Sequence, residues 1–266
     1  MTAPARPSTP GNAGAASSAR PSGPNRTRTP GAFGALYRLV LRNQATVGRM
    51  VAVAALGGVG VLLGLATGAR NTLDPVKTGA DLINGYGLTV LVPVVSLVFA
   101  SSALGDFVDD KTLVYLWLRP VNRFTVAAAS AAAALTICLP AVVLPLVAAA
   151  ALTGAGSALV GGTAVAGAVG VVGYVGMFGA LGLRFRRALV WGLAYILLWE
   201  GYVAQASKTA SRLSVRAYTR SVVSEYTGVG LDQADLALGV AISVPLVVGV
   251  LLVLYTGRRL ARTDVD

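Results

Sequence analysis

The stretch FTVAAASAAAALTICLPAVVLPLVAAAAL, residues 124 to 152, decides the fold class. It carries no charged residue, and a helix needs only about 20 mostly apolar residues to cross a lipid bilayer. This run is therefore long enough to span a membrane. Pro140 and Pro145 interrupt the backbone hydrogen bonding, so we expect a kink or a break near its end.

The rest of the chain repeats this pattern. Of its 266 residues 55% are hydrophobic and 12% charged, about half the charged share of an average soluble domain. Five further apolar runs are long enough to span, namely residues 50–68, 85–104, 158–182, 188–206 and 236–256. The sequence therefore predicts an all-α, polytopic membrane protein with six transmembrane helices.

Two segments precede the first span. Residues 1–30 are rich in Pro, Ser, Ala and Gly and are predicted to be a disordered cytosolic tail, followed by one transmembrane domain over 31–266. In residues 33–49, FGALYRLVLRNQATVGR, apolar side chains recur at helical spacing with basic residues between them. This pattern predicts an amphipathic helix lying on the membrane surface. A simple basic extension of the first span is the alternative.

Composition also excludes several functions. The chain has no histidine, and its single cysteine, Cys138, lies in an apolar run. A disulfide within the chain is thus impossible, and we expect no metal site, no cofactor and no enzymatic activity. The net charge of +11 is read as membrane topology rather than nucleic-acid binding.

The arginines set the predicted orientation. With both termini inside, the cytoplasmic segments hold sixteen Lys and Arg residues and the outer segments six. Because cytoplasmic loops carry the excess of basic residues, this orientation is favoured. Arg outnumbers Lys nineteen to three, which is typical of a GC-rich bacterial genome, so we expect a bacterial cell membrane.

Charges crowd into one predicted cytoplasmic loop, GDFVDDKTLVYLWLRPVNR, residues 105 to 123. Asp106, Asp109 and Asp110 would load the first turn of a short helix, where acids suit the helix dipole. Pro120 would end that helix, with Arg119 before it. A solvated connector of the same charge pattern is the alternative.

A second polar group lies near the opposite membrane face. Glu200 falls inside the fifth apolar run, where a carboxylate is costly and therefore a candidate functional residue. Lys208, Arg212, Arg216 and Arg220 follow at spacings of four, which predicts one cationic helix stripe. Glu200 would pair with Arg212 or Arg216, or else line a substrate path or relay protons. The stripe would contact lipid headgroups or an anionic substrate, or simply face solvent.

Glycine stripes mark close helix packing. Gly60, Gly64 and Gly68 recur every fourth residue in the first span, and glycines recur every third residue from Gly167 to Gly182 in the fourth. Small residues let helix backbones approach in lipid. Packing within the chain and a dimer face both fit this pattern.

Two motifs in order resemble a known family. Thr112-Leu113-x-Tyr115-Leu116 followed by Arg119-Pro120-Val121-x-Arg123 is the first. Trp199-Glu200-Gly201 followed by Leu213-Ser214-x-Arg216-x-Tyr218 is the second. Over roughly residues 33 to 260 the chain resembles the permeases of type-2 ATP-binding-cassette (ABC) exporters.

This resemblance implies a subunit of six helices that pairs with a second permease subunit, as a homodimer or heterodimer, and with cytosolic ATPase subunits. It implies a coupling helix that docks into the ATPase, made of Asp106, Asp109, Asp110, Lys111, Thr112, Tyr115, Arg119, Pro120 and Arg123. It also implies short helices in the outer leaflet, with Glu200, Arg212, Arg216 and Tyr218 as candidates for the substrate path.

The ATPase would be a separate chain, because this sequence has no GxxxxGK[ST] phosphate-binding loop. The expected function is export driven by that partner. A secondary transporter that uses Glu200 as its coupling group, and a non-transporting accessory subunit, are the alternatives.

Overall fold

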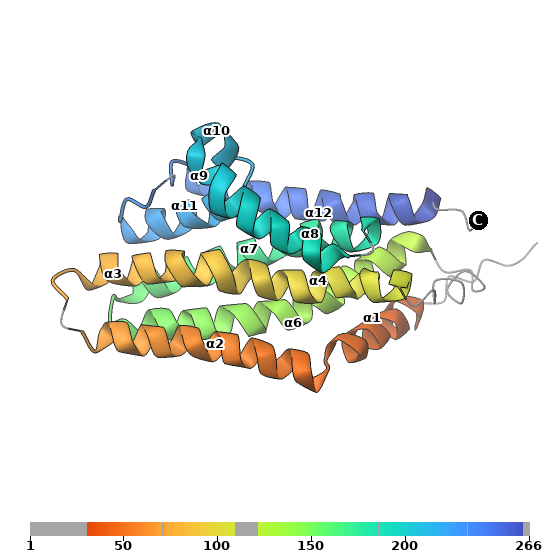
Figure 1. Cartoon of the computed structure of the whole chain (residues 1–266), viewed down its shortest axis with the longest axis horizontal. Coiled ribbons are helices and arrows are strands. Elements are labelled where there is room, and N and C mark those ends of the chain that lie inside the picture. The colour runs from red at the N-terminus through yellow and green to blue at the C-terminus, as the bar shows by residue number, and fades with distance from the viewer. Residues whose placement is uncertain (1–30, 71, 110–121, 186, 233, 263–266) are drawn as a thin grey trace, which may run out of the picture. The chain divides into compact units, whose positions relative to one another are not determined.

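The computed structural model describes residues 31–70, 72–109, 122–185, 187–232 and 234–262. The predicted tail, residues 1–30, lies outside the described residues. All the regular secondary structure in the described part is helical (Figure 1).

The helices follow the apolar runs. In chain order they are α1 (Gly31–Gln44), α2 (Val47–Gly68), α3 (Pro75–Leu82), η1 (Ile83–Leu91), α4 (Val92–Asp109), α6 (Arg123–Leu152), α7 (Ser157–Arg184), α8 (Ala188–Ala194), η2 (Tyr195–Val203), α9 (Ala204–Ala206), α10 (Lys208–Ser211), α11 (Val215–Thr227) and α12 (Leu238–Arg262). The segments η1 and η2 are π-helical, a form whose hydrogen bonds join residues five apart.

Five helices are long and apolar enough to cross a membrane. They are Val47–Gly68, Pro75–Ala103, Arg123–Leu152, Ser157–Arg184 and Leu238–Ala261. The remaining predicted span, residues 188–206, is helical throughout as α8, η2 and α9, but it is not among these five. The expected all-α, multi-pass fold is thus confirmed, whereas the crossing by this sixth segment stays a prediction.

Two details of the spans differ from expectation. The helix α6 is continuous through Pro140 and Pro145, so of the two predicted outcomes the break does not occur, and the kink stays a prediction. The second span begins ten residues before its predicted start, because Asp74 caps α3 by accepting a 3.0 Å hydrogen bond from the backbone of Lys77 and Pro75 suits the first helical position. Polar residues in α3 had hidden this extension from the apolar pattern.

The helix α7 lies at the centre of the bundle, packed against α4, α6, α11 and α12. A side chain on Gly176 would come within 2.5 Å of the carbonyl oxygen of Gly249 on α12, and one on Gly64 within 2.5 Å of that of Ala149 on α6. Both glycine stripes therefore pack within the chain, where only glycine allows such close backbones.

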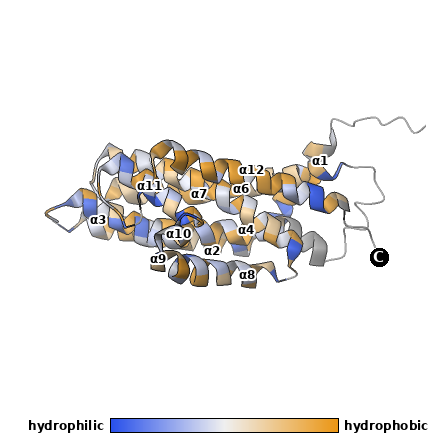
Figure 2. Ribbon diagram, turned by 90° about the horizontal axis from the view of Figure 1, so that it is seen from above, coloured by the Kyte–Doolittle hydropathy of each residue, from blue (hydrophilic) through white to orange (hydrophobic). Residues whose placement is uncertain are grey.

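The bundle has two distinct ends. At the first, named the α1 end, Leu36 of α1 packs with Val126 of α6 and Leu260 of α12. At the second, named the α11 end, α11 contacts α3, and Gly68 of α2 meets Leu152 of α6. Figure 2 shows the middle of the bundle largely hydrophobic, with hydrophilic residues gathered near α1 and near α3.

The helix α1 packs on the bundle through its predicted apolar face. Leu36 and Val40 are buried, and Gln44 follows them one turn later, fully buried. The Gln44 side chain donates a 3.1 Å hydrogen bond to the carbonyl of Phe99 in α4. Arg38 and Arg42 are exposed on the opposite side.

Candidate functional site around Glu200

The carboxylate of Glu200 is only 2% exposed and is surrounded by hydroxyl donors. Tyr174 of α7 donates to its Oε2 at 2.6 Å, and Ser214 donates to its Oε1 at 2.9 Å. Tyr195 donates to Oε1 at 3.3 Å. Burying a carboxylate is costly unless its oxygens are hydrogen-bonded, and here three side chains supply the bonds.

The π-helical form of η2 explains how Tyr195 reaches Glu200. The two residues are five apart, and in a π-helix residues at this spacing stand over one another. Tyr195 also meets Phe178 of α7 edge to face, with ring centroids 6.2 Å apart. The π turn thus places the carboxylate and one of its donors on the side of η2 that faces α7.

Glu200 also holds the start of α11. Ser214 is the residue that precedes this helix and donates to the Glu200 carboxylate, and the backbone N–H of Arg216 in the first turn lies near enough to interact favourably with the same carboxylate. The first amides of a helix lack partners inside the helix and carry partial positive charge. A carboxylate from η2 therefore caps α11 from outside the helix.

Two arginines of α11 face inward beside Glu200. Arg216 is 8% exposed and Arg220 is 7% exposed. Arg220 donates from Nε to the Asn84 side chain of η1 at 2.7 Å. In α11, which lies outside the candidate spans, burial and the nearby charge of Arg216 lower the pKa of Arg220 to about 10, so this guanidinium stays charged at neutral pH.

These groups line a cavity with about 180 Å³ of empty space, including its mouth. Its lining residues are Glu200, Ala204, Gln205, Ser211, Ser214, Arg216, Ala217 and Arg220. The cavity thus contains one carboxylate and two guanidinium groups, next to the positively polarised start of α11.

The predicted cationic stripe is wrong as a single helix face. The chain forms two helices there, α10 and α11, separated by Arg212, Leu213 and Ser214. Arg212 is exposed, and its carbonyl accepts a 2.8 Å hydrogen bond from the Tyr218 hydroxyl. Glu200 therefore meets the segment of residues 207–235 through Ser214 and lies near the Arg216 backbone, and it does not meet that segment through Arg212.

The predicted ATPase-coupling residues are described only in part. Asp110, Lys111, Thr112, Tyr115, Arg119 and Pro120 lie outside the described residues. Asp106 and Asp109 belong to the last described turns of α4, not to the first turn of a separate helix. Arg123 begins α6 and donates a 2.6 Å hydrogen bond to the carbonyl of Leu260, which ties α6 to α12.

Sequence reasoning missed Tyr174, Tyr195 and Asn84 as parts of this site. Tyr174 is fully buried within the glycine stripe of α7. A tyrosine among such small residues could have predicted a buried hydrogen-bond partner for its hydroxyl group. Asn84 and Arg220 are far apart in sequence, and no local pattern connects them.

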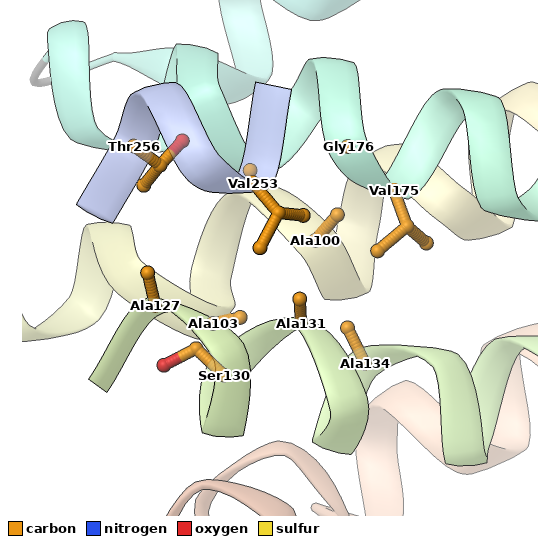
Figure 3. Close-up of a pocket in the computed structure, with 11 residues that line it drawn as sticks. Ala100, Ala103, Ala127, Ser130, Ala131, Ala134, Val175, Gly176, Val253 and Thr256 are labelled. Carbon is orange, nitrogen blue, oxygen red and sulfur yellow. The ribbon is translucent and has the colours of Figure 1, made fainter. Parts of the chain in front are cut away.

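A second cavity lies between α4, α6, α7 and α12, with about 270 Å³ of empty space. Small residues line most of it, and Figure 3 shows Val175 and Val253 pointing into the same space as Ala131 and Ala134. The Ser130 hydroxyl in its wall is buried and has no hydrogen-bond partner among the described residues. This cavity is lined mostly by apolar side chains and lies where α4, α6, α7 and α12 meet.

Comparison with known proteins identifies the family. A comparison with curated proteins finds no match. The sequence model described as ABC-2 family transporter protein matches residues 41–205, a range that runs from the end of α1 to α9 and includes Tyr174, Tyr195 and Glu200. Because this match covers more than half of the chain, the protein belongs to the ABC-2 family of transporter proteins, as a multi-pass membrane permease of ABC-type transport.

Proposed function

We propose that this permease is the membrane subunit of an ABC exporter and is powered by ATP hydrolysis in a separate cytosolic ATPase. Two permease subunits, as a homodimer or heterodimer, would form the membrane part, surrounded by lipid. The family match carries this proposal, because it spans both the loop of residues 105–123 and the Glu200 helix. Substrate would move as the pair alternates between two conformations with different affinities for it.

The distribution of charge supports cytoplasmic termini. The described cations at the α1 end are Arg38, Arg42, Arg49, Arg123, Arg184, Arg187, Arg258 and Arg259. The α11 end also holds cations, but there they are accompanied by acidic residues. These acids are Asp74, Asp81, Glu225, Asp232 and Asp235. By the positive-inside rule this asymmetry favours an α1 end in the cytoplasm, proposed to be that of a bacterial cell, and an α11 end outside.

The segment 188–206 is proposed as the sixth span. Its outward side chains are large and apolar, including Leu189, Val190, Trp191, Leu193, Leu197, Leu198, Tyr202 and Val203. An apolar face of this width suits lipid or a second subunit. The single charged residue inside it, Glu200, is turned toward the protein and hydrogen-bonded.

Cysteine labelling tests the orientation cleanly, because the natural Cys138 is fully buried. A membrane-impermeant maleimide applied to intact cells is expected to label the variant Leu213→Cys at the α11 end. The matched variant Arg258→Cys at the α1 end is expected to react only after the membrane is opened. The reverse pattern would invert the proposed topology.

Charge reversal tests the coupling role of residues 105–123. We expect Asp109→Lys combined with Asp110→Lys to abolish export while the protein still reaches the membrane, because acids that fix the docking register would now repel basic groups of the ATPase. Asp81→Lys together with Glu225→Lys, at two exposed acids of the α11 end, is the matched control. Normal export by the first pair would contradict the coupling role.

A further inference from the structure

The Arg216 side chain occupies an unusual position. It is 8% exposed, its Nε atom is enclosed, and this atom has no hydrogen-bond partner among the described residues. A guanidinium group offers five N–H donors and keeps its charge in proteins. An enclosed donor of this kind calls for an acceptor, and the cavity beside it has room for a single oxygen atom, such as that of water or of one headgroup oxygen.

The neighbouring groups define the chemistry of that acceptor. Glu200 already accepts hydrogen bonds from Tyr174, Tyr195 and Ser214. Arg220 donates to neutral oxygens, the Asn84 side chain and the Asp232 carbonyl, and the exposed Asp232 carboxylate lies outside the cavity lining. The lining residues thus include two cations and one carboxylate. Their net positive charge would be balanced by one further anion.

The surface of the elements that build the cavity indicates what carries this anion. Gln205 lines the cavity and is exposed. Beside the lining residues in the chain, Tyr202, Val203 and Leu213 expose 79%, 41% and 69% of their surfaces. A basic cavity built by elements that also expose apolar side chains suits a molecule with an anionic head and an apolar tail.

We propose that this cavity binds the oxyanion headgroup, a phosphate or a carboxylate, of an amphipathic molecule, with Arg216 as its main ligand and Arg220 as the second. Guanidinium forks match such oxygens in pairs. The same headgroup chemistry belongs to membrane phospholipid and to an amphipathic cargo. Placing the cavity at the outer leaflet rests on the proposed function, whereas binding itself does not.

The test uses the full chain purified in dodecyl maltoside, with dodecyl phosphate as the probe because it has the same tail and a charged head. The Tm of wild type is expected to rise as dodecyl phosphate is added and to reach a plateau. Arg216→Gln is expected to weaken apparent binding at least tenfold. Arg70→Gln, which removes the same charge from an exposed position outside the cavity lining, is the matched control and is expected to bind as wild type does. Equal responses of the two variants would overturn the proposal.

A second variant covers the case in which Arg216→Gln does not fold. Ala204→Leu fills the cavity and keeps both arginines, so it is expected to lose binding; retained binding would overturn the proposal. Co-purified lipids of wild type and Ala204→Leu are then compared by mass spectrometry. An anionic phospholipid that is enriched only in wild type identifies membrane lipid as the molecule that supplies the headgroup. This conclusion holds even if the lipid prevents dodecyl phosphate from binding.

Probe binding without such a lipid identifies a cargo site. If wild type neither binds the probe nor carries an enriched lipid, the cavity holds water only and the proposal is overturned. These measurements need no ATPase, so their outcome can be interpreted even if the proposed exporter function is wrong.

Discussion

The hydroxyl of Tyr174 on α7 donates a 2.6 Å hydrogen bond to the carboxylate of Glu200 on η2. Both groups are buried, and α7 is the central helix of the bundle. This bond therefore connects the bundle core to the helix that in turn caps α11 through Ser214.

Removing this donor is expected to destabilise the protein. Tyr174→Phe leaves a buried carboxylate with one fewer partner, which typically costs about 1–3 kcal/mol. Thermal unfolding in mild detergent measures the loss. Tyr202→Phe, at a position that is 79% exposed, is the control. A Tm of Tyr174→Phe as high as that of Tyr202→Phe would show that the bond contributes nothing.

Glu200→Gln is expected to loosen the start of α11. The amide side chain cannot offer two charged oxygens to Ser214 and the Arg216 backbone, so the first turn loses its charge-assisted cap. Hydrogen exchange of residues 213–218 is expected to quicken about tenfold, which corresponds to about 1.4 kcal/mol. Glu225→Gln, on the exposed side of α11, serves as the comparison. Unchanged exchange in Glu200→Gln would remove the capping role.

Gly176→Ala is expected to be costly, and Gly161→Ala on the same helix is expected to be tolerated. A side chain at Gly176 would approach the Gly249 carbonyl to 2.5 Å, whereas one at Gly161 would lie 3.8 Å from the Tyr226 ring. Overpacking typically costs about 1–3 kcal/mol. Comparison of the two Tm values checks this, and equal values would mean that α7 and α12 do not pack as described.

The alanine-lined cavity predicts a contrast within α6. Ala134 borders this small space, so Ala134→Val is expected to cost less stability than an equal enlargement at a close-packed position. Ala150→Val, at a fully buried position outside the cavity lining, is expected to lose about 1–3 kcal/mol. Thermal unfolding of both variants distinguishes a real cavity from a tightly packed one, in which both would be equally destabilised.

Apolar run length was sufficient to predict most of the spans, because a bilayer demands long uncharged helices. It failed where a local feature extended a helix beyond the apolar run, as Asp74 and Pro75 do at α3. The predicted break at Pro140 and Pro145 was also wrong, because α6 accommodates both prolines and continues through them.

The candidate site was only half visible in the sequence. Glu200 stood out because charges are rare in apolar runs. Its partners Tyr174 and Ser214 come from other elements and follow no spacing rule, and the π-helical turn that presents Tyr195 leaves no periodic pattern. The inward orientation of Arg216 and Arg220 depended on the chain breaking between α10 and α11, which an i, i+4 stripe does not reveal.

The central claim is that this permease works with a separate ATPase. The most direct measurement is mild-detergent purification of the tagged protein from its own membranes, with mass spectrometry of co-purifying chains and an assay of ATP hydrolysis. The account predicts a stoichiometric ATP-hydrolysing subunit that is lost when Asp109 and Asp110 are both changed to Lys. A permease that purifies alone, with no ATP hydrolysis, would contradict it.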